Sequence, residues 1–187
     1  EYGLTAPKSD ITFTAKGGVT GRVRLGDQTP TGSDLYAVKG DEARVVLVAT
    51  FVETSLARSP FDLRDKRVLR FERDQADGLE ITAAGRVPVT FTRANSDWRV
   101  TAPVNARGDY GAIEGLLTRL STTMMSGIET TDLADLKKYG LDNPASSIVV
   151  KAGSSTATLV VGTSVEGKAY ARDLARPMVF TVDPAFA

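Results

Sequence analysis

The chain uses one six-residue phrase twice, and this repeat constrains its fold more than any other feature. Residues 2–7 read Tyr-Gly-Leu-Thr-Ala-Pro, and residues 139–144 read Tyr-Gly-Leu-Asp-Asn-Pro. After each phrase come an alternating apolar segment, a glycine turn, a Leu-Gly or Val-Gly pair and a Tyr-Ala segment. Self-similarity at a fixed spacing indicates a duplicated structural unit. The sequence therefore predicts two related β-rich units joined by a middle segment.

Each copy is predicted to form an antiparallel β-meander, because its apolar residues alternate with polar ones. Alternation with a period of two is typical of a half-buried strand. Glycine-rich turns separate the expected strands. The strands expected in the two copies are 10–15, 19–25, 35–38 and 44–49, then 147–152, 157–161, 168–172 and 178–182.

The middle segment is predicted to contain further strands and one amphipathic helix. The strands are expected at 68–71, 79–82, 87–92 and 98–101. The helix is expected from Asp109, its N-cap, to about Met125, with Gly127 in the left-handed conformation that ends many helices. The helix carries one apolar stripe, which we expect to be buried against the middle sheet. Glu114 is expected to face away from this stripe. The stripe comprises Ile113, Leu116, Leu117, Leu120 and Met124.

Together these expectations describe an α+β fold in three parts. The first meander takes residues 1–60, the hairpin-plus-helix segment residues 61–130, and the second meander residues 131–187. A chain of 187 residues is long enough for one sizeable domain or two small ones. A helical-looking stretch leads into the second Tyr-Gly-Leu phrase but not into the first, so we expect the chain to be cut from a longer protein.

The composition argues against several classes of function. The 23 basic and 23 acidic residues balance, whereas a nucleic-acid binder normally carries a basic excess. There is no Cys and no His, which excludes disulfides, thiolate or histidine metal sites and a Ser-His-Asp triad. No glycine-rich phosphate loop or calcium-binding loop occurs. We therefore predict no cofactor, no metal site and no catalytic residue.

Four side chains are candidate contacts for a partner or a ligand. Arg64, Lys66 and Arg67 lie in a stretch dense in charges of both signs. Such a stretch is typical of a solvated turn, and the alternative is a polar contact surface for a partner. Trp98, the single Trp, is expected in the core, with a ligand-stacking platform as the alternative.

The repeated phrase is assigned a structural role, with a paired binding surface as the alternative. A glycine can end a short helix in the left-handed conformation, a leucine can pack beneath it, and a proline prevents the helix from continuing. The residues concerned are Tyr2, Gly3, Leu4, Pro7, Tyr139, Gly140, Leu141 and Pro144.

The order of these features resembles a bacterial family of domains of unknown function, DUF4340. The resemblance rests on the Tyr-Gly-Leu-x-x-Pro phrase, the Leu-Arg-Asp-Lys-Arg stretch at 63–67 and the Trp-Arg-Val-Thr-x-Pro segment at 98–103. It implies a periplasmic or cell-surface domain, held by an N-terminal membrane anchor outside these 187 residues. It also implies an association with ABC-transporter permeases and auxiliary proteins of the gliding-motility type. The family provides no catalytic residues to carry over.

We therefore expect a non-enzymatic module that contacts membrane-transport or envelope proteins through sheet edges and loops. The first alternative is a small-ligand or glycan-binding domain with a cleft between the repeats. The second is a hydrolase with paired carboxylates. Acidic residues of 62–80 alternate with basic ones, which favours surface ion pairs over such a site. The sequence leaves the oligomeric state open.

Overall fold

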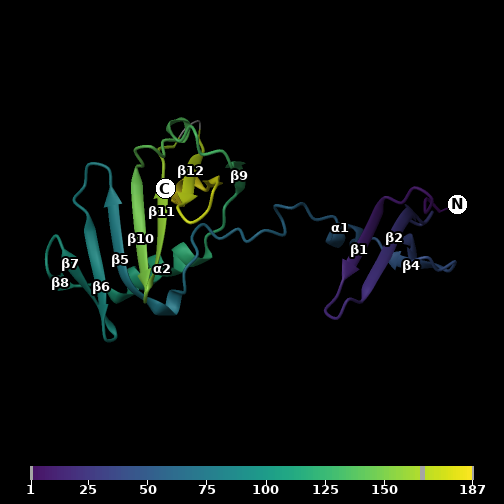
Figure 1. Cartoon of the computed structure of the whole chain (residues 1–187), viewed down its shortest axis with the longest axis horizontal. Coiled ribbons are helices and arrows are strands. Elements are labelled where there is room, and N and C mark those ends of the chain that lie inside the picture. Colours follow the sequence, from purple (N-terminus) through teal and green to yellow (C-terminus); the bar gives the residue numbers. More distant parts are fainter. Residues whose placement is uncertain (1, 165–166, 187) are drawn as a thin grey trace. The chain divides into compact units, whose positions relative to one another are not determined.

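Strand pairing divides the fold into two separate β-sheets (Figure 1). A computed structural model describes residues 2–164 and 167–186, and the chain forms two compact units, residues 1–64 and 65–187. The fold is mainly β with few helices, which is broadly consistent with the α+β class expected from the sequence.

The first unit is a four-stranded antiparallel meander followed by a short helix. Its strands pair in chain order, as the alternating sequence predicted. The elements are β1 (Ser9–Thr14), β2 (Thr20–Gln28), β3 (Asp34–Lys39), β4 (Val45–Ala49) and α1 (Phe51–Leu56). Leu25, Leu35 and Ala37 form a small core, against which Val52 of α1 packs.

The second unit is built on a nine-stranded sheet with the order β8-β7-β6-β5-β10-β11-β12-β13-β9. Its first elements are η1 (Arg73–Gln75), β5 (Ala76–Ala83), β6 (Val89–Ala94), β7 (Asp97–Ala102), β8 (Ala106–Arg107), α2 (Tyr110–Thr122) and β9 (Gly127–Thr130). The remaining elements are η2 (Lys137–Tyr139), β10 (Ser146–Ala152), β11 (Ser155–Val161), β12 (Ala169–Asp173), β13 (Val179–Val182) and η3 (Pro184–Phe186).

The middle segment and the second meander share this sheet, because β5 pairs with β10 along its length. The structure therefore divides the chain after Arg64, and the expected parts 61–130, from residue 65 on, and 131–187 belong to one unit. The pairing closes one edge of the second meander, and β9 closes the other edge by pairing with β13. Alternation in the sequence does not specify such a distant strand partner.

One face of the nine-stranded sheet carries the core of the second unit. The registers place Leu79 of β5 opposite Val150 of β10, and Ala171 of β12 opposite Phe180 of β13. All four side chains are buried, and Trp98 of β7 lies on the same face. Its indole Nε1 donates to Glu114 of α2 at 2.9 Å, so α2 lies on this face and buries its apolar stripe there. The buried residues of α2 are Ile113, Leu117 and Leu120.

Helix α2 confirms its predicted start but not its predicted end. The Asp109 carboxylate accepts from the backbone N–H of Ala112 at 2.9 Å, the geometry of an N-cap. The helix stops at Thr122, and Gly127, instead of ending it, begins β9. Met124 is therefore exposed, while its neighbour Met125 is buried.

The middle segment also begins differently from the prediction. Residues 68–71 form no strand, although Val68 and Leu69 are fully buried. Arg67 forms only an isolated bridge with Met124, and the backbone N–H of Val68 donates to the carbonyl of Thr123. Val68 and Leu69 are therefore buried where the segment after Asp65 pairs briefly, in antiparallel direction, with the residues that follow α2.

The repeated Tyr-Gly-Leu phrase packs against a glycine of each meander, Gly26 near the end of β2 and Gly162 directly after β11. The backbone of Gly140 is left-handed, with φ of 64°, and closes η2 as the sequence predicted. Gly162 lies directly beneath, because a Cβ built on it would stand 2.2 Å from the carbonyl oxygen of Tyr139. The first copy repeats this contact, with 2.1 Å from a Cβ on Gly26 to the oxygen of Tyr2. These contacts favour the structural role of the phrase.

We expect Gly162→Ala to destabilise the second unit by about 1–3 kcal/mol, the usual cost of overpacking. The added methyl would meet a backbone oxygen, which cannot rotate away as a side chain can. Chemical denaturation followed by fluorescence of Trp98 reports this unit. The matched control is Gly115→Ala on α2, where a Cβ meets nothing within 4 Å and better helix propensity should stabilise slightly. Equal stability of the two variants would contradict the packing argument.

Candidate functional site

A hollow of about 310 Å³ lies between the segment 67–75 and the β10–β11 hairpin of the second unit. We name it the Arg67 pocket. Its lining residues are Arg67, Arg70, Phe71, Glu72, Gln75, Val150, Ala152, Ser155, Thr156 and Ala157. The pocket combines two guanidinium groups and a carboxylate with an apolar floor contributed by the hairpin.

Asp65 organises the basic side of the Arg67 pocket. Its Oδ2 accepts from Arg67 Nη2 at 2.8 Å and lies 3.1 Å from Nε of Arg70. The backbone N–H of Arg67 also donates to its Oδ1. The hydrogen bonds from Arg67 lower the pKa of the Asp65 carboxyl well below its ordinary range. Asp65 therefore stays ionised and is unsuited to act as a general acid near neutral pH.

A buried ion pair fixes the backbone beside the Arg67 pocket. Arg176 Nε donates to Asp173 Oδ2 at 3.0 Å, and both side chains are almost fully buried. Arg176 Nη2 donates to the carbonyl oxygens of Arg67 and Val68 at 2.6 and 2.8 Å. Desolvation by burial lowers the pKa of Arg176. This side chain therefore connects the loop after β12 to the segment that carries the pocket arginines.

The floor of the Arg67 pocket exists because two small side chains face each other. Val150 of β10 lies opposite Ala157 of β11. At the equivalent register of the first meander, Phe13 lies opposite Gly21. The Phe13 ring covers that glycine, since a Cβ on Gly21 would stand 2.4 Å from the ring. The floor of the hollow therefore depends on residues of the second meander that differ from those of the first.

The chemistry of the Arg67 pocket suits binding. Arg67 and Arg70 can orient a carboxylate or a backbone carbonyl, and the Ser155 and Thr156 hydroxyls offer both donors and acceptors. The volume stands at the lower limit for sites that hold small molecules. Within residues 2–164 and 167–186, no group of three or more Asp or Glu side chains is placed to hold a metal ion.

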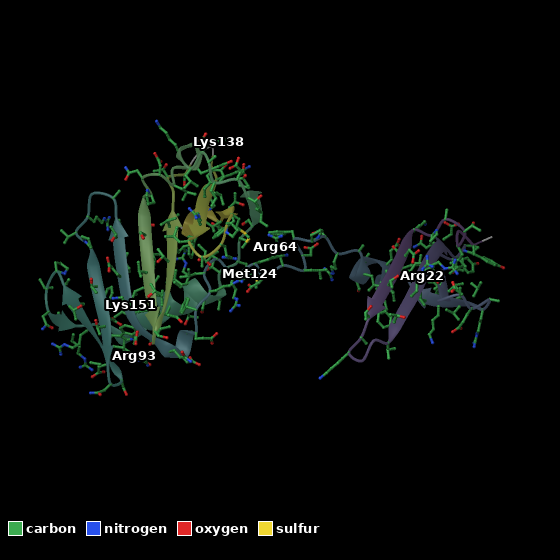
Figure 2. The ribbon with its side chains drawn as sticks, in the orientation of Figure 1. Arg22, Arg64, Arg93, Met124, Lys138 and Lys151 are labelled. Atoms are coloured by element: carbon green, nitrogen blue, oxygen red, sulfur yellow. The ribbon has the colours of Figure 1, made fainter. Side chains whose placement is uncertain are left out.

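The structure separates the four candidate contact residues. Arg64 is exposed at the end of the first unit (Figure 2). Lys66 is half-buried, and its backbone carbonyl accepts from the N–H of Met125. Arg67 lines the pocket and is held by Asp65. Trp98 is 1% exposed, which corrects its alternative role as a ligand platform and confirms the core position.

Sequence reasoning missed the polar residues that make buried or half-buried contacts in the second unit. Glu114, expected to face away from the core, accepts from Trp98 and from Arg73 Nη2 at 2.8 Å. The sequence did not indicate that Asp173 and Arg176 are buried, because two opposite charges three residues apart usually lie in a solvated turn. The sequence feature that sets this pair apart is its place between two strands of apolar residues.

Replacing Asp65 with Asn should cost about 1 kcal/mol at neutral pH, a small value because the pair is partly screened by solvent. The folded-state pKa of Asp65 is depressed, so its contribution is present above the unfolded value of about 4 and is lost as the pH falls below it. Denaturation at pH 3 and pH 7 measures this difference. Asp97→Asn, whose exposed pair with Arg107 spans 3.8 Å, is the control. A loss at Asp65 that is independent of pH would contradict the assignment.

In the part of the chain that the structure describes, no helix is long and apolar enough to cross a membrane. The longest, α2, has 13 residues. About 20 are needed to span the hydrocarbon core of a bilayer.

Comparison with known protein families gives a match that spans the whole chain. The model of a family described as a domain of unknown function, DUF4340, matches residues 1–97 and 98–187. No curated protein and no solved structure matches the chain. The two matched segments meet within the β6–β7 hairpin, so they do not coincide with the two compact units.

Proposed function

Since the chain belongs to the DUF4340 family, we propose that it is a non-enzymatic module that binds another protein outside the cytoplasm. It serves as an accessory part of an ABC-type transport or envelope assembly and is held at the membrane by an N-terminal anchor. The observation that carries the proposal is the exposed apolar surface of the first unit. Exposed apolar patches and unpaired strand edges are surfaces that partner proteins commonly use.

The outer strands of the first unit offer this surface. Among the described residues, β1 and β4 each pair on one side only. β4 exposes Val45, Val46 and Leu47 in succession, and β1 exposes Phe13. An edge strand of this kind presents unpaired backbone donors and acceptors together with apolar side chains. If a partner added a strand at this edge, its backbone would pair with the free donors and acceptors, and its side chains would cover the apolar ones.

A pull-down from gently solubilised native membranes tests the proposal. We expect transporter permease or ATPase subunits to copurify with the tagged full-length protein, and recovery to fall about tenfold (~1.4 kcal/mol) in Leu47→Lys. Val87→Lys is the matched control, because Val87 is similarly exposed but lies in the second unit, in the loop before β6. Loss of recovery in both variants, or in neither, would contradict binding through the first unit.

Small-ligand binding is a second candidate function, and the Arg67 pocket favours it. An acidic sugar or a carboxylate should raise the thermal unfolding temperature of the unaltered protein and of Arg58→Gln, an exposed arginine of the first unit. It should not stabilise Arg70→Gln, because that variant lacks a guanidinium of the pocket. An equal response of the two variants would contradict binding at this site.

A further inference from the structure

The two meanders have the same registers but differ in what covers them. Leu25 of β2 lies opposite Ala37, as Val161 of β11 lies opposite Ala171. Rings of equivalent tyrosines also pair, at centroid distances of 4.4 Å in the first copy and 5.1 Å in the second. Equivalent positions can therefore be compared directly, and any difference in burial reflects the surroundings of each meander.

Apolar positions that are buried in the second meander are exposed in the first. Phe13 is 55% exposed, whereas its counterpart Val150 is fully buried. Val46 is 37% exposed, whereas its counterpart Phe180 is fully buried. The same holds for Val45 against Val179 and for Tyr2 against Tyr139. At these positions the first meander thus keeps the apolar pattern of a covered sheet without the cover, whereas its core at Leu25, Leu35 and Ala37 is buried.

Three parts of the segment 65–138 provide that cover in the second unit. β5 extends the sheet beside β10, with Leu79 opposite Val150. α2 lies on the same face as Val150 and Phe180, where its Glu114 accepts from Trp98 of β7, and the segment 67–75 lies beside Val150. Leu133 and Leu136 pack on the opposite face, against the cluster of Tyr139, Tyr170 and Val179. In the first unit, Val52 of α1 packs against the core, but no described strand pairs with the outer edge of β1.

The edge of β1 is suited to receive a strand. Its register with β2 is unbroken from Ser9 to Thr14, so no bulge twists the edge away. The strand contains neither Pro nor Lys, the residues that commonly block pairing at exposed edges. Asp10 and Arg22 form an ion pair on the polar face of β1 and β2, and Phe13 is exposed on the other face.

We propose that the first unit is an acceptor for a polypeptide segment with the architecture of residues 65–138. That segment adds an antiparallel strand beside β1, with an apolar residue opposite Phe13, and lays an amphipathic helix on the face that carries Phe13 and Val46. The inference rests on the proposed protein-binding function and specifies the class of partner. A second copy of this chain does not fit, because its own segment 65–138 is already occupied by its second meander.

A tandem chain tests the inference, with residues 65–138 repeated directly before Tyr2. The junction reproduces the natural connection of Lys138 to Tyr139, so the added segment reaches the first meander as it reaches the second. We expect the amides of Ser9–Thr14 that do not bond to β2 to exchange at least about tenfold more slowly than in the unaltered chain. Hydrogen exchange with mass spectrometry measures this.

The control is the same tandem with Leu79→Asp and Leu117→Asp in the added copy only, which should lose the protection. If the β1 amides of the tandem show no added protection from exchange, the inference is overturned. This result counts when blue-shifted fluorescence shows that Trp98 and its copy in the added segment are both buried, so that both segments are folded. Protection already present in the unaltered chain, as a monomer or a dimer, would identify the chain itself as the occupant and would also overturn it. If the tandem fails but membrane proteins still copurify in a Leu47-dependent way, the binding function stands and only the class of partner is wrong.

Discussion

Arg176→Ala is expected to destabilise the second unit by about 3–5 kcal/mol, the usual cost of breaking a buried ion pair from one side. The substitution leaves the Asp173 carboxylate buried without its guanidinium partner. It also removes both hydrogen bonds to the carbonyl oxygens of Arg67 and Val68. The cost therefore combines an unpaired charge with two unsatisfied backbone acceptors.

Urea denaturation followed by Trp98 fluorescence measures this effect in the second unit alone, because the first unit contains no Trp. Arg107→Ala is the matched control, since its ion pair with Asp97 is exposed and 3.8 Å long. We expect that control to lose less than about 1 kcal/mol. A loss of similar size in both variants would show that the buried pair does not support the fold.

A double variant, Asp173→Leu with Arg176→Met, separates the two sources of the cost. It removes both charges, so no buried ion is left without a partner. We expect it to be more stable than Arg176→Ala, although the carbonyls of Arg67 and Val68 still lack their donor. A double variant no more stable than Arg176→Ala would mean that the cost lies in the backbone hydrogen bonds that both variants lack, and not in the unpaired charge.

The sequence predicted local structure well because short-range patterns specify it. Alternation located the four strands of each meander, and the Asp109 side chain marked the start of α2. The sequence could not identify β10 as the partner of β5. β10 lies about 70 residues later, and any other strand with an alternating pattern could have paired there. We therefore expected the middle segment to form a sheet of its own. In the structure, its strands instead join the sheet of the second meander through the pairing of β5 with β10.

The candidate site was harder to predict than the fold. Arg67 was identified from a charge-dense stretch, but that stretch did not indicate its contact with Asp65 or the hollow beside it. Arg176 approaches the pocket from about 110 residues away in sequence. The same limitation explains why the contacts of Glu114 were not predicted. The helical period shows which side of a helix is apolar, but not which polar residue beside the apolar stripe will be buried.

Glu114→Ala is expected to destabilise the second unit by about 2–3 kcal/mol. Glu114 accepts from the Trp98 indole at 2.9 Å and from Arg73 at 2.8 Å, and Arg93 lies 3.7 Å away. Removing the carboxylate leaves the buried indole N–H without a partner, which alone costs about 1–3 kcal/mol. The two arginines are more exposed than the indole and add less.

Glu114→Gln tests whether the hydrogen bond or the charge matters more. The amide oxygen can still accept from Trp98, so we expect this variant to lose about half as much stability as Glu114→Ala. Asp74→Ala is the control, because Asp74 also contacts Arg73 but is almost fully exposed, and it should lose less than about 0.5 kcal/mol. Equal losses for the Gln and Ala variants would assign the stabilisation to the ion pairs with Arg73 and Arg93. An unchanged Trp98 emission with an unchanged denaturation midpoint in Glu114→Ala would show that α2 is held to the sheet by its apolar stripe alone.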